Sequence, residues 1–309
     1  MSIIEQAAKR LEALRRAGFE APPVPEQNAT RNRPQKADEA AVLPSTPRAT
    51  DAIAANATSG FSTGRIAGRI DFELDLAKLA RDGFVTPDIP RSRIADEFRI
   101  VKRPLIANAT GKRAMPIKNG NLIMITSSMP GEGKTFCSIN LAMSIAMELD
   151  QTVLLVDADV ARPSLPRVLG IPAGKGLLDA LQSKSFDVDQ ACIRTNVEKL
   201  TILPSGTPHA RATELLASEA MERMLDELAA RSPDRIVIFD SPPLLVTTES
   251  RELATHMGQI VFVVQAETTL QRDVKLALAT IEVCPVKMIL LNQARTAAQG
   301  GYGYGYGYK

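Results

Sequence analysis

Hydrophobic and polar residues follow a regular pattern from about residue 120 onward. Short apolar runs alternate with stretches in which apolar residues recur every three or four positions, most clearly at 135–149, 211–230 and 269–282. The runs are typical of strands buried on both faces, and the stretches are typical of helices. Strands are expected at 121–127, 152–158, 200–205, 235–240, 259–264 and 286–292. This alternation predicts an α/β fold, a mostly parallel sheet with helices on both faces.

The first third of the chain has a different pattern. Residues 1–18 predict a short amphipathic helix, with one apolar face formed by Ile3, Ile4, Ala7, Leu11 and Leu14. A helix of this length is marginal alone in water, so it is expected to dock on its own domain, on a membrane or on a partner protein.

Residues 19–92 predict a mostly disordered linker, because proline, alanine and threonine replace the apolar periodicity. A brief helical pattern interrupts it at 72–79. A helix is expected from 93 to 108, which Pro104 closes or kinks. The main folded domain is therefore placed at 93–295, and a tail at 296–309.

Composition narrows the class of protein. The chain has 309 residues, of which 45% are hydrophobic and 23% are charged, as in ordinary soluble domains. A net charge of +2 argues against a nucleic-acid partner. Three cysteines without a Cys-x-x-Cys pair are typical of a reducing compartment. No apolar run reaches the roughly 18 residues that span a membrane, so a cytoplasmic protein is expected.

The segment SSMPGEGKT follows the first predicted strand and precedes a helix. It matches the phosphate-binding pattern GxxxxGK[ST] at Gly133, Lys134 and Thr135, with Ser128 in place of the first glycine. Backbone N–H groups from Gly131 to Thr135 are expected to cradle phosphates. Lys134 is expected to reach the β- and γ-phosphates, and the Thr135 hydroxyl to bind Mg²⁺. ATP and Mg²⁺ are the predicted cofactors.

Three aspartates lie at the ends of predicted strands. Asp157 and Asp159 follow one buried strand and Asp240 ends another. Ligands bind at the carboxyl ends of the strands of a parallel sheet. Because buried carboxylates are costly without a cation, these residues favour a magnesium site.

Every tyrosine of the chain lies in the final segment, GYGYGYGYK: Tyr302, Tyr304, Tyr306 and Tyr308. Glycine at every second position prevents stable packing of the rings into a core. Two interpretations remain open. The tail is disordered or adheres as a strand to a sheet edge or another chain, or its hydroxyls are substrates of a phosphoryl-transfer site.

At these motifs the chain resembles a known family. SSMPGEGKT, VDADVARP and FDSPP resemble the Walker A, A′ and B motifs of the bacterial tyrosine kinases (BY-kinases), which are P-loop proteins with a MinD/ParA-like fold. Two upstream segments, IDFELDLAKLARDGFVTPD and RSRIADEFRIVKRPL, are similar to the exosortase A-associated autokinases of exopolysaccharide biosynthesis.

The resemblance implies an ATP-dependent protein-tyrosine autokinase that phosphorylates its own C-terminal tyrosines, in trans within an oligomeric ring, and regulates exopolysaccharide synthesis or export. It implies a membrane chain-length determinant or polysaccharide co-polymerase as activator, and a protein-tyrosine phosphatase. The chain would then lie at the inner face of the cytoplasmic membrane through its partner.

The resemblance also assigns roles to single residues. The catalytic residues would be Lys134, Asp157, Asp159 and Asp240, with Asp157 accepting the tyrosine proton; the division of roles between Asp157 and Asp159 stays open. The metal ligands would be Thr135, Asp159 and Asp240. Asn292 would contact the adenine, or only form a strand-end turn. The nucleotide-binding residues would be Ser128, Pro130, Gly131, Glu132, Gly133, Lys134, Thr135, Phe136, Arg162 and Asn292. The oligomer interface would include Glu97, Arg99, Lys102 and Arg103.

Two other classes of protein compete with this interpretation. A MinD/ParA-type ATPase switch has a similar fold and phosphorylates no tyrosine, but its signature lysine is replaced here by Met129. A nucleotide-binding adaptor without phosphoryl transfer is disfavoured by the three aspartates and the tyrosine tail.

Overall fold

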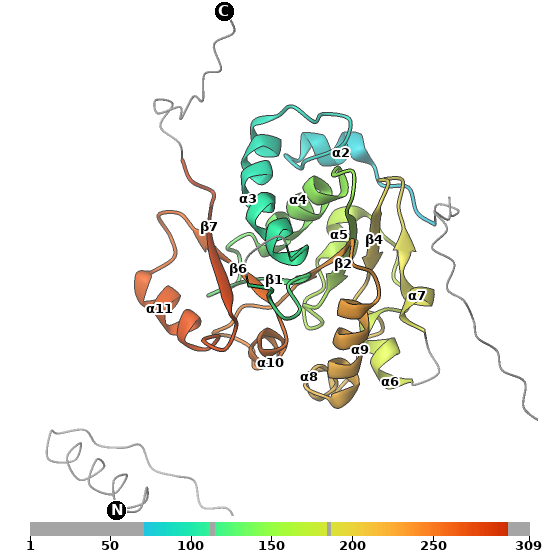
Figure 1. Cartoon of the computed structure of the whole chain (residues 1–309), viewed down its shortest axis with the longest axis vertical. Coiled ribbons are helices and arrows are strands. Elements are labelled where there is room, and N and C mark those ends of the chain that lie inside the picture. The colour runs from blue at the N-terminus through green and yellow to red at the C-terminus, as the bar shows by residue number, and fades with distance from the viewer. Residues whose placement is uncertain (1–70, 112–114, 184–186, 296–309) are drawn as a thin grey trace, which may run out of the picture. The chain divides into compact units, whose positions relative to one another are not determined.

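The computed structural model describes residues 71–111, 115–183 and 187–295 (Figure 1). In these residues one sheet of seven strands has the order β3-β4-β2-β5-β1-β6-β7. All neighbouring strands are parallel except β3 and β4. The strands are β1 (Leu122–Ser127), β2 (Thr152–Asp157), β3 (Ile193–Arg194), β4 (Leu200–Leu203), β5 (Arg235–Asp240), β6 (Gln259–Gln265) and β7 (Val286–Asn292).

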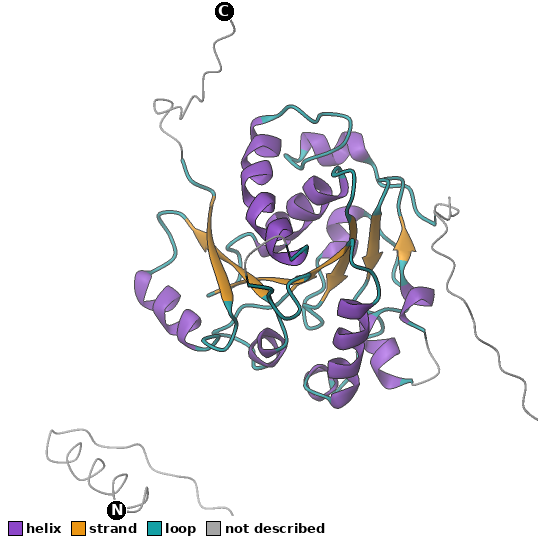
Figure 2. Ribbon diagram, in the orientation of Figure 1, coloured by secondary structure: helices purple, strands orange, loops and turns teal. Residues whose placement is uncertain are grey.

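Helices cover both faces of the sheet (Figure 2). Side chains alternate along each strand, so Ile123 and Ile125 of β1 join one core cluster while Leu122 and Met124 join the other. The first cluster is covered by α2 (Leu76–Arg81), α3 (Arg93–Ala109), α4 (Lys134–Ala146) and α5 (Leu165–Leu169). The second is covered by α6 (Leu177–Gln182), α7 (Val188–Ala191), α8 (Ala212–Leu216), α9 (Glu219–Ala230), α10 (Glu249–Thr255) and α11 (Gln271–Ala279).

The predicted α/β fold is confirmed, and each of the six predicted strands is present. The stretch 211–230, predicted as one helix, contains two. Ser218 separates α8 from α9, because its hydroxyl donates to Leu215 O (2.7 Å) and caps α9 by accepting from Met221 N (3.4 Å). The prediction missed β3 and the four short helices α5, α6, α7 and α10.

The predicted linker is wrong for residues 71–92, which fold onto the catalytic domain. Leu74, Leu79 and Val85 are each at most 2% exposed and belong to the core cluster beneath α3 and α4. Phe72 forms an isolated bridge to Thr195. The helical apolar pattern of this segment is thus a packing face, and the domain begins before residue 93. Residues 1–18 and 19–70 lie outside the described residues.

The helix predicted at 93–108 is α3, which continues through Pro104 to Ala109. Proline therefore does not close this helix, which ends where the Thr110 hydroxyl donates to Ile106 O (2.9 Å). Of the helices in the described ranges, none combines the length and apolarity needed to cross a membrane.

Candidate functional site: the phosphate loop and the strand-end aspartates

The glycine-rich loop predicted to bind phosphates connects β1 to α4. Gly131 and Gly133 have φ angles of 87° and 95°, which residues with a Cβ rarely adopt. A Cβ at Gly133 would also lie 1.9 Å from Asn292 Nδ2, at the end of β7. Glycine at 133 is therefore required both by its backbone conformation and by the close approach of β7.

The start of α4 suits a phosphate group. The first N–H groups of a helix have no partner within it and attract anions, and here they belong to Lys134 and the residues that follow it. The Lys134 side chain is 8% exposed. Burial lowers the pKa of its ammonium group, while the nearby carboxylates of Asp240 and Asp159 act in the opposite direction.

The other predicted nucleotide-binding residues fall into three settings. Pro130 and Gly131 are exposed at the tip of the loop. Ser128 is buried, and its hydroxyl has no partner among the described residues. Phe136 and Asn292 line a pocket of about 740 Å³ between α3, the start of α4 and the end of β7.

Glu132 lies in the loop but directs its side chain into the protein. Its carboxylate accepts hydrogen bonds from Met129 N (2.8 Å) and from the hydroxyl of Thr269, between β6 and α11. Its carbonyl oxygen accepts a hydrogen bond from Asn292 Nδ2 (3.0 Å). Glu132 therefore ties the loop to the ends of β6 and β7, and the Asn292 amide contacts the loop itself.

Asp157 and Asp240 are direct neighbours in the register of β2 and β5. Asp240 accepts hydrogen bonds from the hydroxyls of Thr135 (2.7 Å) and Ser138 (3.0 Å). Asp157 Oδ2 accepts one from Leu165 N (3.2 Å), but Asp157 Oδ1 is buried with no partner among the described residues.

These surroundings make both carboxyl groups hard to ionise. Burial and the neighbouring Asp240 raise the pKa of Asp157 to about 8. Burial raises the pKa of Asp240 to about 6, against the effect of its two hydroxyl donors. Near neutral pH the ligand-free site therefore keeps a proton on Asp157, and a cation bound beside these groups would favour their charged forms.

Asp159 lies two residues beyond Asp157, past the end of β2, and is only partly buried. Burial raises the pKa of its carboxyl group, although the Arg162 N–H donates to Asp159 Oδ1 (3.2 Å). Arg162 is exposed, and its backbone N–H holds the turn after β2.

The sequence interpretation missed three hydroxyl residues of the site, Ser138, Ser164 and Thr269. Ser138 lies three residues after Thr135, a helical spacing that places both on the side facing Asp240 and could have revealed it. Ser164 Oγ lies 2.6 Å from Thr135 Oγ1. Thr269 carries no local sequence signal, because its partner Glu132 is 137 positions away.

The predicted metal ligands are partly assembled. Thr135 and Asp240 are hydrogen-bonded to each other, with Asp159 beyond the end of β2. The described residues contain no group of three or more His, Cys, Asp or Glu side chains arranged as a metal site. Magnesium, however, commonly takes only one or two carboxylates and completes its shell with water and phosphate oxygens. The unpartnered Asp157 Oδ1 and the buried carboxyl groups fit such an ion.

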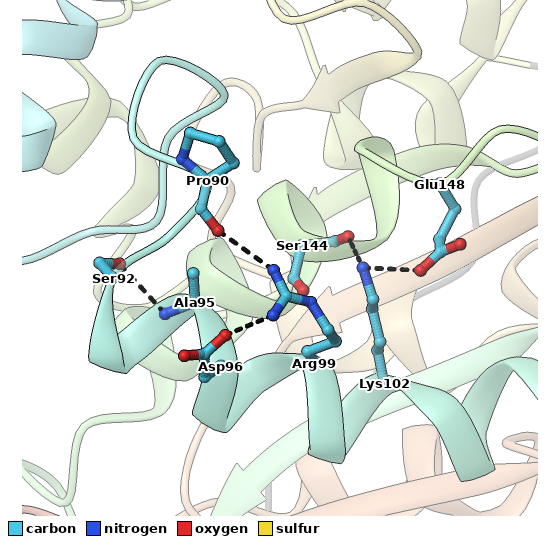
Figure 3. Close-up of polar contacts among 8 residues, drawn as sticks. All are labelled: Pro90, Ser92, Ala95, Asp96, Arg99, Lys102, Ser144 and Glu148. Carbon is cyan, nitrogen blue, oxygen red and sulfur yellow. Dashed lines mark hydrogen bonds and ion pairs between the residues drawn. The ribbon is translucent and has the colours of Figure 1, made fainter. Parts of the chain in front are cut away.

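The predicted oligomer-interface residues lie on α3, but Lys102 is not at the surface (Figure 3). Its ammonium group pairs with Glu148 Oε1 (2.8 Å) and donates to the carbonyl oxygen of Ser144, so its prediction as an interface residue is wrong. The side chain leaves α3 on the side that packs against α4, and its length lets the charge reach the end of that helix.

The other three interface candidates are more accessible. Arg103 and Glu97 are exposed, and Glu97 pairs with Arg93 (2.9 Å). Arg99 pairs with Asp96 and donates to the carbonyl oxygen of Pro90 (3.1 Å), as Figure 3 shows. The predicted phosphorylation sites lie outside the described residues: Tyr302, Tyr304, Tyr306 and Tyr308.

Comparison with known proteins shows the family of the chain. Residues 120–289 match the AAA domain family. The chain is 31% identical over 216 residues to the tyrosine-protein kinase YwqD of Bacillus subtilis (strain 168), covering 69% of this chain and 87% of YwqD. It is 31% identical over 214 residues to the succinoglycan biosynthesis transport protein ExoP of Rhizobium meliloti (strain 1021), covering 67% of this chain and 25% of ExoP.

A solved structure agrees as well. The kinase domain of the Escherichia coli tyrosine kinase ETK superposes with a TM-score of 0.56 at 25% identity, covering 75% of this chain and 98% of that domain. The phosphate loop, the parallel sheet and the domain match define a P-loop nucleotide-binding protein of the AAA domain family. Within that class, the chain belongs to the bacterial tyrosine-protein kinases, as its resemblance predicted.

The buried carboxyl group of Asp157 makes stability depend on pH. The folded chain keeps the Asp157 proton up to about pH 8, whereas the unfolded chain releases it near the ordinary pKa of 3.8. The folded state binds more protons between these values, so rising pH destabilises it. Since one pKa unit corresponds to about 1.4 kcal/mol, Asp157→Asn is expected to stabilise the ligand-free chain by on the order of 5 kcal/mol at about pH 8, and by about 1 to 2 kcal/mol at about pH 5. Urea unfolding at both pH values measures this, with the exposed Asp226→Asn as control. An equal gain at both pH values contradicts it.

The contact between Glu132 and Thr269 is expected to hold the loop in its binding conformation. Thr269→Val removes the hydroxyl donor at almost constant volume, and should weaken binding of an ATP analogue by about tenfold. Titration with a fluorescent analogue measures the loss. The neighbouring Thr268 is exposed, so Thr268→Val should bind normally. Equal affinity of the two variants for the analogue would mean that the contact between Glu132 and Thr269 does not contribute to nucleotide binding.

Proposed function

We propose that the chain transfers the γ-phosphate of ATP to the tyrosines of its own C-terminal tail, in trans within an oligomer, and so regulates exopolysaccharide synthesis or export. One observation carries this proposal: the unpartnered, buried oxygen of Asp157 lies beside Asp240, which is hydrogen-bonded to Thr135 of the phosphate loop. Membership of the bacterial tyrosine kinases supports the reaction, and the confinement of all tyrosines to 302–308 supports the substrate.

The residues of the site divide the work of phosphoryl transfer. Lys134 and the N-terminus of α4 bind the phosphates of ATP, while Thr135, Asp240 and Asp159 hold Mg²⁺, which supplies positive charge to the transferred group. Bound Mg²⁺ would favour the ionised form of Asp157, whose Oδ1 would then accept the proton of the tyrosine hydroxyl as the hydroxyl oxygen bonds to the γ-phosphorus and ADP leaves. Asp157 suits this role better than Asp159, because Asp159 Oδ1 already accepts the Arg162 N–H.

Transfer between chains requires an assembly that brings one tail to another site. The outer side of α3, with Glu97, Arg99 and Arg103, supplies the contact surface of a homo-oligomeric ring, and Lys102 serves inside the protomer instead. Each phosphate adds about −1.5 to −2 charges, so a phosphorylated tail leaves the acidic site and the ring loosens. A protein-tyrosine phosphatase resets the cycle.

The exopolysaccharide role draws on the relative ExoP, named for succinoglycan biosynthesis transport, of which this chain spans a quarter. A membrane co-polymerase supplies the remaining part and activates the kinase at the inner face of the cytoplasmic membrane. The second candidate function is a MinD/ParA-type ATPase switch without tyrosine kinase activity, and Met129 at the position of its signature lysine disfavours that candidate.

Loss of the Lys134 ammonium group should abolish phosphotyrosine without unfolding the chain, because the group serves phosphates and not the core. Intact-mass measurement with ATP and Mg²⁺ should show up to four added phosphates in the parent chain, all in the last peptide, and none in Lys134→Met. The exposed Lys118→Met should behave as the parent. ATP hydrolysis with no added phosphate in the parent would support the ATPase switch instead.

Transfer in trans is tested by mixing two chains. One carries Lys134→Met and an intact tail, and the other is active but has phenylalanine in place of its four tyrosines. Because only the inactive chain offers hydroxyls, phosphate is expected on its tail, at a rate that rises with the concentration of the active chain. Mass spectrometry of the tail peptide measures it. If the parent chain acquires phosphate on its tail but the inactive chain in the mixture does not, transfer occurs within one chain.

A further inference from the structure

Strand β7 forms one edge of the sheet (Figure 1). In the described residues it pairs with β6 alone, over its whole length of seven residues. Every second backbone N–H and C=O of an edge strand points away from its neighbour and can pair with a further strand. Proteins commonly cover such an edge, because an open one promotes aggregation.

One face of β7 is uncovered and mainly apolar, with Lys287 at its beginning followed by Ile289 and Leu291. Met288 and Leu290 pack against the core cluster beneath α3 and α4. Ile289 and Leu291 point to the opposite face, where they are 58% and 60% exposed. On the neighbouring strand the partner of Ile289 in the register is Phe262, which is fully buried. The helices of the second layer therefore cover β6 and stop short of β7.

The sequence that follows has the period of a strand. Residues 302–308 alternate tyrosine and glycine over seven positions, the length of β7. Side chains alternate between the two faces of a strand, so all four rings would share one face. Tyrosine has a high strand propensity, and glycine leaves the other face free of side chains.

The connection is long enough for the chain to turn back. Residues 293–301 separate β7 from the first tyrosine. Nine extended residues reach roughly 30 Å, whereas the tail needs to move sideways by only about 4.8 Å, the spacing of neighbouring strands. Because the tail is tethered to β7, the local concentration of this occupant is high at any protein concentration.

We propose that residues 302–308 add to the free edge of β7 in the same chain as an antiparallel strand, with the tyrosine rings on the side of Ile289 and Leu291. The backbone of the tail satisfies the open N–H and C=O groups of β7, and the rings cover the exposed apolar side chains. In this position the four tyrosine hydroxyls lie along β7 and not in the candidate site at the phosphate loop.

This resting position has a consequence for regulation, which rests on the proposed kinase function. A docked tail is withheld from a neighbouring active site, so undocking precedes transfer. A phosphorylated tyrosine carries a charged, strongly hydrated group that the exposed side chains of Ile289 and Leu291 do not accommodate. The one cation of β7, Lys287, already donates to the carbonyl oxygens of Glu282 and Cys284. Phosphorylation would therefore prevent the tail from returning to β7.

Amide hydrogen exchange tests the docking without any phosphoryl transfer, in full-length Lys134→Met chains free of nucleotide. The parent tail and a tail with all four tyrosines replaced by phenylalanine should slow the outward-facing amides of β7 by about tenfold relative to a tail with four serines. Equal exchange in the tyrosine and serine tails would overturn the proposal. The kinase function is untouched by that result, since an undocked tail can still be a substrate.

Two further comparisons identify the surface and the occupant. Ile289→Ser with Leu291→Ser should lose the protection, whereas Ile100→Ser, a change at a 74% exposed residue of α3, should keep it. Protection retained in the double variant would overturn the assignment to this face. Protection by the tail of the same chain should not depend on protein concentration. Protection that grows with concentration would mean that the tail or the β7 edge of a second copy pairs with the strand. That result would overturn the assignment to the same chain.

Discussion

The burial of two adjacent carboxyl groups constrains the whole site. Asp157 and Asp240 lie side by side at the ends of β2 and β5, in surroundings that disfavour their charged forms. The protein offsets this cost for Asp240 with the hydroxyls of Thr135 and Ser138, and leaves one oxygen of Asp157 without a donor. Carboxyl groups with strongly shifted pKa values are typical of functional sites, and these two would be stabilised in their charged forms by a cation bound beside them.

The phosphate loop is held by parts of the chain that are distant in sequence. Its glycines supply the turn, but Glu132 and Asn292 fix its position against the ends of β6 and β7. Since all these strands are parallel, their carboxyl ends meet at one edge and bring these side chains within reach of one another. Topology, rather than local sequence, assembles the loop.

The extent of the sequence prediction follows from how local each signal is. Buried strands appear as apolar runs, and the phosphate loop as a motif with a strand before it and a helix after it, so both were predicted closely. Helices of one or two turns, such as α7 and α10, are too short for periodicity to reveal. The inward side chain of Glu132 was missed because a loop motif specifies backbone conformation and not side-chain direction. Lys102 was misplaced for a related reason, since its partners Ser144 and Glu148 are more than 40 positions away.

The contacts of Lys102 connect α3 to the C-terminal end of α4. Its ammonium group contacts Ser144 and Glu148 at the C-terminal end of α4. Helix α4 has 13 residues, is about 20 Å long and begins at Lys134. We expect a displacement of the charged outer side of α3 to be felt along α4 as far as Lys134. The outer side of α3 and the phosphate loop are thus connected through α4, and loss of the Lys102 contacts would weaken this connection.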